Sequence, residues 1–200
     1  MYVARLLYPV KVLGPGNRIG IWLAGCQHQC PGCSNPELWK FEEKYRTSMA
    51  VVMRLIADLQ CSGPVDGFTV TGGDPFEQPD ALRRLLPELS KISEDILVYT
   101  GYQFDQIRQR YPDILTSVGV MIDGTYLEER NNGCRLRGSD NQKIYVLRQS
   151  LKHKYADYLE TNSNEIQNFS TGSSVVSVGI HEAGYQNRLD QAMGEKGVEA

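Results

Sequence analysis

The sequence predicts an α/β fold built around a parallel sheet, and two features of the chain support this prediction. Short apolar runs alternate with helical patterns over residues 1–150, as expected for β/α units joined by right-handed crossovers. Polar and glycine-rich segments follow directly after several of these runs. Because open parallel sheets bind ligands at the carboxyl ends of their strands, the predicted fold already indicates where a functional site lies.

Apolar runs bounded by turn residues define the predicted strands. Within the first 150 residues these runs are residues 19–24, 68–71, 96–100, 118–122 and 143–147. Residues 161–174 are rich in Asn, Ser, Thr and Gly, which predicts a loop, and a further strand is expected at residues 175–180. The chain therefore divides into a main domain, residues 1–150, and a C-terminal extension, residues 151–200. The extension is expected to complete the sheet, to dock a partner or to be partly disordered.

Three segments have the 3.6-residue apolar period of amphipathic helices. Thr47 and Ser48 can cap the first helix, whose apolar face comprises Met49, Val52, Met53, Ile56 and Leu59. Pro79 suits the first turn of the second helix, whose apolar face comprises Leu82, Leu85, Leu86 and Leu89. The third helix is marked by Phe104, Ile107 and Tyr111.

The charge and hydropathy of the chain argue against two classes of function. The 21 basic and 24 acidic residues give a net charge of −3, whereas nucleic-acid-binding domains usually carry an excess of positive charge. The longest apolar stretch, residues 19–25, is too short to span a bilayer, and the N-terminal residues lack a secretory signal pattern. We therefore expect a cytoplasmic protein that binds neither nucleic acid nor membranes.

Three of the five cysteines, Cys26, Cys30 and Cys33, lie within eight residues in a C-x3-C-x2-C arrangement. In a reducing compartment such a cluster indicates metal binding or redox chemistry rather than a disulfide framework. Three thiolates in one loop can hold three corners of a 4Fe–4S cube and leave the fourth iron open to a small molecule. Cys61 and Cys134 stand alone and are expected to be small buried hydrophobic residues.

Two other interpretations of the cysteine cluster remain open. A structural zinc site would need a fourth ligand, for which His28 is available, but such sites usually combine two separated pairs of ligands. The pair Cys30 and Cys33 could form a redox-active dithiol, which would leave Cys26 without a role. Apart from the zinc interpretation, we expect His28 to be an exposed loop residue or a hydrogen-bond donor to a sulfur.

The segment 71–75, Thr-Gly-Gly-Asp-Pro, follows a predicted strand. Two consecutive glycines allow the backbone to approach a ligand closely, and we expect that a side chain at Gly73 would occupy ligand space. The same residues also suit a simple strand-to-helix turn. Similar polar segments follow later strands, at Tyr99-Thr-Gly-Tyr102, Asp123-Gly124 and residues 137–142.

These motifs together resemble those of the radical S-adenosylmethionine (radical SAM) superfamily. The C-x3-C-x2-C motif follows an early strand, and residues 71–75 are similar to the superfamily's GGEP motif, with Asp74 in place of Glu. Residues 25–39, GCQHQCPGCSNPELW, resemble more narrowly the activating proteins of anaerobic ribonucleotide reductase. Gly32 stands where many superfamily members have an aromatic residue, and this departure is also seen in the reductase activators.

The resemblance implies a fold and a set of cofactors. The implied fold is an incomplete (β/α)6-type barrel, open on one side, because a complete eight-stranded barrel needs about 250 residues. The implied cofactors are one 4Fe–4S cluster on Cys26, Cys30 and Cys33, and S-adenosylmethionine. The residues implied to contact S-adenosylmethionine are Gly72, Gly73, Asp74, Thr100, Asp123 and Asn141.

The resemblance also implies an activity and two partners. The reduced cluster would cleave S-adenosylmethionine to a 5′-deoxyadenosyl radical, which removes a hydrogen atom from a glycine of a glycyl-radical enzyme. The expected partner is the large subunit of anaerobic ribonucleotide reductase, and the expected electron donor is a flavodoxin or a ferredoxin. Two alternatives stay open: the same radical acting on a peptide or small molecule, and a non-catalytic iron–sulfur protein.

Overall fold

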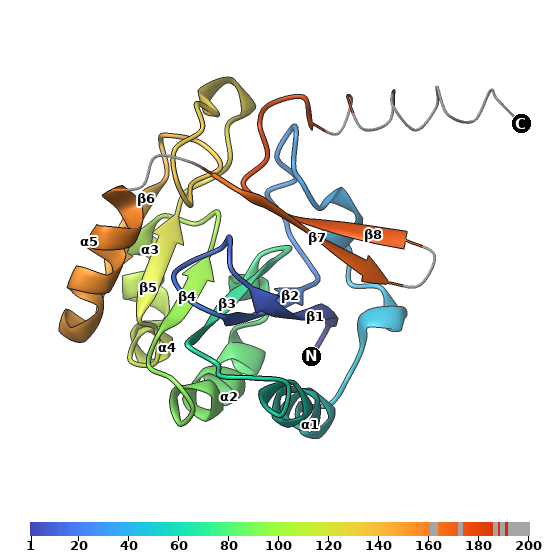
Figure 1. Ribbon diagram of the computed structural model, residues 1–200, viewed down its shortest axis with the longest axis vertical. Coiled ribbons are helices and arrows are strands. Elements are labelled where there is room, and N and C mark those ends of the chain that lie inside the picture. Colours follow the sequence, from blue (N-terminus) through green and yellow to red (C-terminus); the bar gives the residue numbers. More distant parts are fainter. Residues whose placement is uncertain (161–163, 172–173, 186–187, 189–190, 192–200) are drawn as a thin grey trace, which may run out of the picture.

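The computed structural model describes residues 1–160, 164–171, 174–185, 188 and 191. Its main feature is a six-stranded sheet in which the strands follow one another in chain order. The strands are β1 (Val3–Val10), β2 (Arg18–Leu23), β3 (Gly67–Gly72), β4 (Ile96–Tyr99), β5 (Val120–Asp123) and β6 (Lys143–Val146). The mixed α/β architecture that the sequence predicts is confirmed (Figure 1).

The sheet is parallel only in its centre, where β2, β3, β4 and β5 pair in the same direction. The two edge strands, β1 and β6, are antiparallel to their neighbours, so the predicted parallel sheet is confined to the four central strands. The apolar pattern of β1 is interrupted by Arg5 and Pro9, which hid it in the sequence. Proline is tolerated there because β1 is an edge strand.

Helices α1 (Met49–Gln60) and α2 (Pro79–Ser90) form where the sequence predicts them. The Ser48 hydroxyl accepts a hydrogen bond from the backbone N–H of Val51 at 3.3 Å and caps α1. Both helices bury their apolar faces in one core with the central strands. The remaining helices are α3 (Phe104–Arg110), α4 (Pro112–Leu115) and α5 (Lys152–Glu160), with 3₁₀ turns η1 (Pro36–Leu38), η2 (Glu43–Tyr45), η3 (Pro75–Glu77), η4 (Glu128–Arg130) and η5 (Gln149–Leu151). In the part of the chain that the structure describes, no helix is both long enough and apolar enough to cross a membrane.

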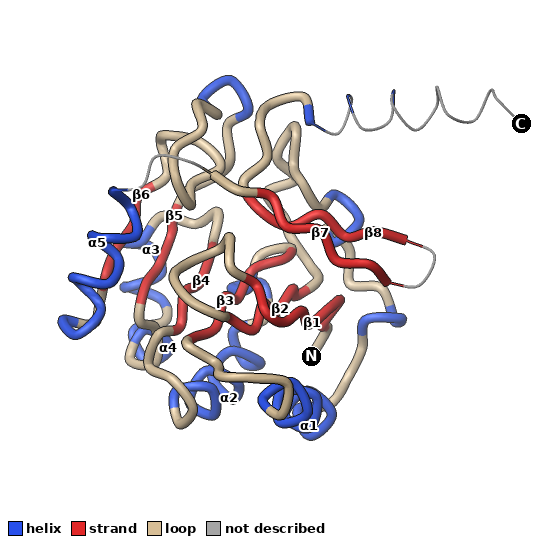
Figure 2. Tube along the Cα trace, in the orientation of Figure 1, coloured by secondary structure: helices blue, strands red, loops and turns tan. Residues whose placement is uncertain are grey.

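The C-terminal extension forms a hairpin, and this corrects the predicted loop at residues 161–174. Strands β7 (Ile166–Thr171) and β8 (Ser174–Gly179) pair antiparallel in a two-stranded sheet of their own (Figure 2). The polar composition of β7, Ile-Gln-Asn-Phe-Ser-Thr, is the reason that the sequence pattern missed it. The predicted strand at residues 175–180 corresponds to β8. Residues 161–163 and 172–173 of the predicted loop, and the last part of the extension, lie outside the described residues.

A buried group of charges joins the amino ends of the central strands to α5. Arg18, at the start of β2, places its Nη2 3.0 Å from Asp95 Oδ1, just before β4. Lys154 Nζ lies 2.6 Å from Asp95 Oδ2, and the Tyr155 hydroxyl donates to Asp95 Oδ1 at 2.7 Å. Burial opposes ionisation of Asp95, but the Arg18 guanidinium and these hydrogen bonds outweigh it and hold the pKa of Asp95 below its ordinary value.

Candidate cofactor site

The cysteine-bearing loop begins directly after β2 and is fixed by backbone contacts. Gly25 N donates to Leu38 O at 2.8 Å, and Cys26 N donates to Trp39 O at 2.9 Å. A side chain at Gly25 would collide with the Phe41 ring, 2.2 Å from the position of its Cβ, and the residue has a positive φ of 94°. Glycine is therefore required where the chain leaves the sheet and enters the cysteine loop.

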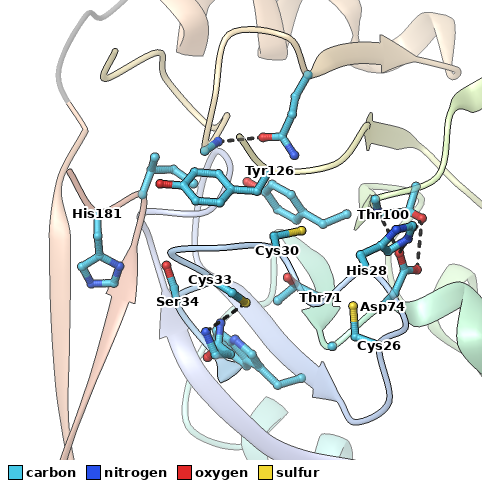
Figure 3. Close-up of a pocket in the computed structure, with 18 of the residues that line it drawn as sticks. Cys26, His28, Cys30, Cys33, Ser34, Thr71, Asp74, Thr100, Tyr126 and His181 are labelled. Carbon is cyan, nitrogen blue, oxygen red and sulfur yellow. Dashed lines mark hydrogen bonds and ion pairs between the residues drawn. The ribbon is translucent and has the colours of Figure 1, made fainter. Parts of the chain in front are cut away.

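The three cysteines line one cavity together with the carboxyl ends of the central strands. The strand-end residues in this lining include Gly73, Asp74, Thr100, Gly101 and Gly124. Figure 3 shows the side chains of Cys26, Cys30 and Cys33 directed into this common space. The prediction that the glycine-rich segments converge at the carboxyl ends of the strands is thus confirmed for β3, β4 and β5.

The three thiols are half-buried, and burial affects the ionisation of Cys26 and Cys30. Burial raises the pKa of Cys26 to about 11 and also raises the pKa of Cys30. One stabilising contact comes from Asn35, whose backbone N–H donates to Cys33 Sγ at 3.4 Å. Thiols in this setting become thiolates when a cation compensates their charge, and the iron ions of a cluster would supply that compensation.

The geometry distinguishes between the interpretations of the cysteine cluster. Within the described residues, no three His, Cys, Asp or Glu side chains come close enough together to hold a single metal ion. An iron–sulfur cube binds its thiolates at separate irons, so three thiols that line one cavity without converging on one point suit it. A redox pair of Cys30 and Cys33 would leave Cys26 without a role, although all three line the cavity. The residues therefore fit a cubane cluster best.

Asp74 links the cysteine loop to two strand ends. Its carboxylate is 1% exposed and accepts hydrogen bonds from Phe76 N at 2.9 Å, from Thr100 Oγ1 at 3.0 Å and from Gly101 N at 2.8 Å. His28 Nε2 lies 3.1 Å from Asp74 Oδ2. This contact with Asp74 raises the pKa of His28. His28 is thus held against Asp74 at the edge of the cavity, which the sequence did not predict.

Comparison with known proteins identifies the family. A family model described as a 4Fe–4S single cluster domain matches residues 12–145. The chain is 31% identical over 150 residues to the anaerobic ribonucleoside-triphosphate reductase-activating protein of Escherichia coli strain K12, covering 70% of this chain and 96% of the relative. Similar proteins of the same name are found in Salmonella typhi, with 30% identity over 149 residues (70% of this chain, 96% of the relative), and in Enterobacteria phage T4, with 34% identity over 145 residues (70% and 90%). The chain belongs to the family of anaerobic ribonucleoside-triphosphate reductase-activating proteins. The predicted resemblance to these activators, and the presence of a 4Fe–4S domain, are confirmed.

In this member of the activating-protein family, the glycine pair of residues 72–73 serves backbone packing. A Cβ at Gly73 would lie 2.3 Å from Gly25 O and 2.9 Å from Leu38 O, and a Cβ at Gly72 would lie 2.2 Å from Leu23 O. Gly73 lines the cavity, whereas Gly72 is not part of its lining. A side chain at Gly73 would therefore displace the cysteine loop before it reached ligand space, which corrects the expectation drawn from the sequence.

Asp123 and Asn141 make contacts with the loops beside the cavity and are not part of its lining. Asp123 accepts hydrogen bonds from Phe104 N at 2.7 Å and Lys143 N at 3.2 Å, and Asn141 Nδ2 donates to Thr125 O at 2.8 Å. Their neighbours Gly124 and Gln142 line the cavity instead. Of the residues predicted to contact the cofactor, three line the cavity with the cysteines: Gly73, Asp74 and Thr100. The other three lie outside its lining: Gly72, Asp123 and Asn141.

Sequence reasoning missed several residues that line the cavity. Tyr126 lies beside Cys30 and Cys33. Gln142 also lines the cavity. Ser177 and His181 come from the C-terminal hairpin. The position of Tyr126, two residues after Gly124, was a usable signal, because that segment follows a strand end. Ser177 and His181 had no such signal, since only the docking of the hairpin brings them to the cysteines.

Proposed function

We propose that this chain activates anaerobic ribonucleoside-triphosphate reductase by cleaving S-adenosylmethionine at a 4Fe–4S cluster and generating a glycyl radical on the reductase. The observation that carries the proposal is the cavity in which three cysteines from one loop face the carboxyl ends of three neighbouring strands. The names of the relatives support the reductase as the target.

The proposed ligands of the cluster are Cys26, Cys30 and Cys33. The contact of His28 with Asp74 favours an iron corner without a protein ligand, where S-adenosylmethionine can bind. When reduced by an external one-electron donor, a cluster held by these cysteines would supply the electron that cleavage of S-adenosylmethionine requires.

The residues of the chain bind and orient the cofactor. We assign the methionyl part of S-adenosylmethionine to the side of the cavity formed by Gly73, Asp74 and Thr100. The Asp74 carboxylate is fixed by hydrogen bonds to Thr100 Oγ1 and Gly101 N, so it presents negative charge at a constant position, suited to an ammonium group. Gly72, Asp123 and Asn141 support the site indirectly, because they hold in place the backbone of the loops that line the cavity.

The open shape of the sheet supports a macromolecular substrate. The six strands follow each other in order without closing, and we interpret them as an incomplete (β/α)6-type radical SAM barrel. In this interpretation a glycine-bearing loop of the partner completes the enclosure and keeps water and stray hydrogen donors away from the radical. A flavodoxin or ferredoxin in the cytoplasm would supply the electron.

The proposal is tested by mixing anaerobically reconstituted protein, a reductant and S-adenosylmethionine with the reductase large subunit from the same cell. We expect deoxyadenosine release together with a glycyl signal in electron paramagnetic resonance, and little cleavage without the subunit. The matched controls are the Cys30→Ala and Cys61→Ala variants, of which only the first should abolish both signals. Rapid turnover of a peptide or metabolite, with no glycyl signal on the reductase, would contradict the proposal.

A further inference from the structure

The β7–β8 hairpin lies beyond the part of the chain that defines the family. The family model ends at residue 145, and 96% of the Escherichia coli relative is matched by only 70% of this chain. The hairpin nevertheless forms one wall of the cysteine cavity. β8 contributes Ser177, Val178 and Gly179, and the segment directly after it contributes Ile180 and His181. A segment outside the family domain is therefore part of the site.

The hairpin is docked by specific contacts with the main sheet. The Gln167 side chain donates to Pro9 O at 2.7 Å and accepts from Lys11 N at 3.0 Å. On the other strand, Val178 is 2% exposed and belongs to the same apolar cluster as Trp22. These contacts hold β8 in a defined position beside the cavity.

A second groove adjoins the cysteine cavity near Ser177 and His181. That groove runs between the cysteine loop and β8, and Trp39, Val175 and Tyr185 line it. Ser177 and His181 belong to the lining of both spaces. Figure 3 shows His181 across the cavity from Asp74 and His28. Cys30, Cys33 and Tyr126 also line both spaces, so the two hairpin-side residues lie where two adjoining parts of one cleft meet.

The His181 ring has one satisfied and one unsatisfied nitrogen. Nε2 lies 2.9 Å from Ser177 Oγ, which in turn lies 3.2 Å from the Tyr185 hydroxyl. Nδ1 is buried and makes no hydrogen bond with any described residue. Burial lowers the pKa of His181 and so favours the neutral form of the ring. A buried nitrogen without a partner is unfavourable. Because His181 lines the cavity, a rotation of its ring would bring Nδ1 to a ligand there.

We propose that His181, oriented by Ser177, binds S-adenosylmethionine through a hydrogen bond to Nδ1, and that the hairpin covers the occupied cavity. This inference rests on the proposed function, because that function supplies the identity of the ligand. His181 and the strand-end residues Gly73, Asp74 and Thr100 would then hold the ligand from opposite sides. The chain carries this wall in addition to the domain shared with its relatives.

Two substitutions separate the hydrogen bond from the covering of the cavity. His181→Phe keeps a ring in the wall but removes both nitrogens, whereas His181→Ala also opens the wall. The exposed His153 on α5 gives the matched control, His153→Ala. We expect both His181 variants to bind S-adenosylmethionine about tenfold more weakly in anaerobic calorimetry, with the iron content unchanged. Without S-adenosylmethionine, air should bleach the cluster absorption faster in His181→Ala than in the wild type.

The outcomes distinguish this proposal from the proposed function. Wild-type affinity in both His181 variants, together with S-adenosylmethionine binding by the wild type, would overturn the role of His181 alone. Weak binding by His181→Ala with normal binding by His181→Phe would overturn the hydrogen bond, because a ring without nitrogens would then suffice. Reconstituted wild-type protein that binds no S-adenosylmethionine would overturn both proposals. Weaker binding by His153→Ala would show that the effect is not specific to the hairpin.

Discussion

The polar groups at the two ends of the central strands differ in whether a neighbouring charge compensates them. At the amino ends, the charges of Arg18, Asp95 and Lys154 are paired with one another, and Arg18 is completely buried. At the carboxyl ends, the thiols of Cys26 and Cys30 are half-buried with raised pKa values. The paired charges at the amino ends stabilise the fold. The thiols at the carboxyl ends, whose ionisation burial opposes, are available to bind a cofactor.

The largest expected effect comes from replacing a cysteine of the loop at the carboxyl ends of the central strands. Cys30→Ala removes one of three proposed cluster ligands, and we expect the reconstituted protein to lose its cluster absorption. The wild type should hold about four irons per chain. Cys61→Ala is the control, because Cys61 is exposed at the end of α1, which corrects the predicted buried position, and is not part of the cavity lining. Stoichiometric zinc without sulfide in the wild type would contradict the assignment of these cysteines to an iron–sulfur cluster.

Removing the buried ion pair at the amino ends of the central strands should lower the stability of the fold and leave the cofactor site intact. Asp95→Asn leaves the buried Arg18 guanidinium without its carboxylate, and removing one partner of a buried ion pair costs about 3–5 kcal/mol. We expect a loss of this size in the free energy of unfolding, measured by urea denaturation. Asp58→Asn, at an exposed position on α1, should change the free energy by less than about 0.5 kcal/mol.

The same ion pair predicts a pH dependence. Because the folded pKa of Asp95 lies below its ordinary value, its ionised carboxylate stabilises the fold fully at pH above about 4. This stabilisation is lost as the pH falls through the lowered pKa, because the folded state then takes up the proton. Urea midpoints of the wild type should decline in this acidic range, and the difference from Asp95→Asn should shrink. A constant difference down to pH 2 would show that the charge of Asp95 is not responsible.

The two ends of the sheet also differ in how well the sequence predicts them. The central strands and helices α1 and α2 follow from apolar periodicity, because their side chains fill one core. The three cysteines follow from their spacing. His28 and Gly101 contact Asp74 only because the folded chain brings their loops next to it. These contacts could therefore not be predicted from the sequence. The same holds for His181 and for the packing role of Gly73, which both depend on segments that are distant in sequence.

The smallest expected effect concerns His28, whose role separates the remaining interpretations of the cysteine loop. The structure places its ring against Asp74 and in edge contact with Tyr102, with ring centroids 4.5 Å apart. If His28 only positions the loop and Asp74, then His28→Asn should retain full iron content and weaken S-adenosylmethionine binding about twofold to tenfold, the size expected for the loss of one polar contact with Asp74. If His28 were a metal ligand, the substitution would instead lower the metal content as strongly as Cys30→Ala. Iron analysis and calorimetry on the same anaerobic preparations decide between the two, with His153→Ala as the control. We expect intact iron content, because a ring held by the Asp74 carboxylate stays at the strand ends and leaves an iron corner open to the ligand.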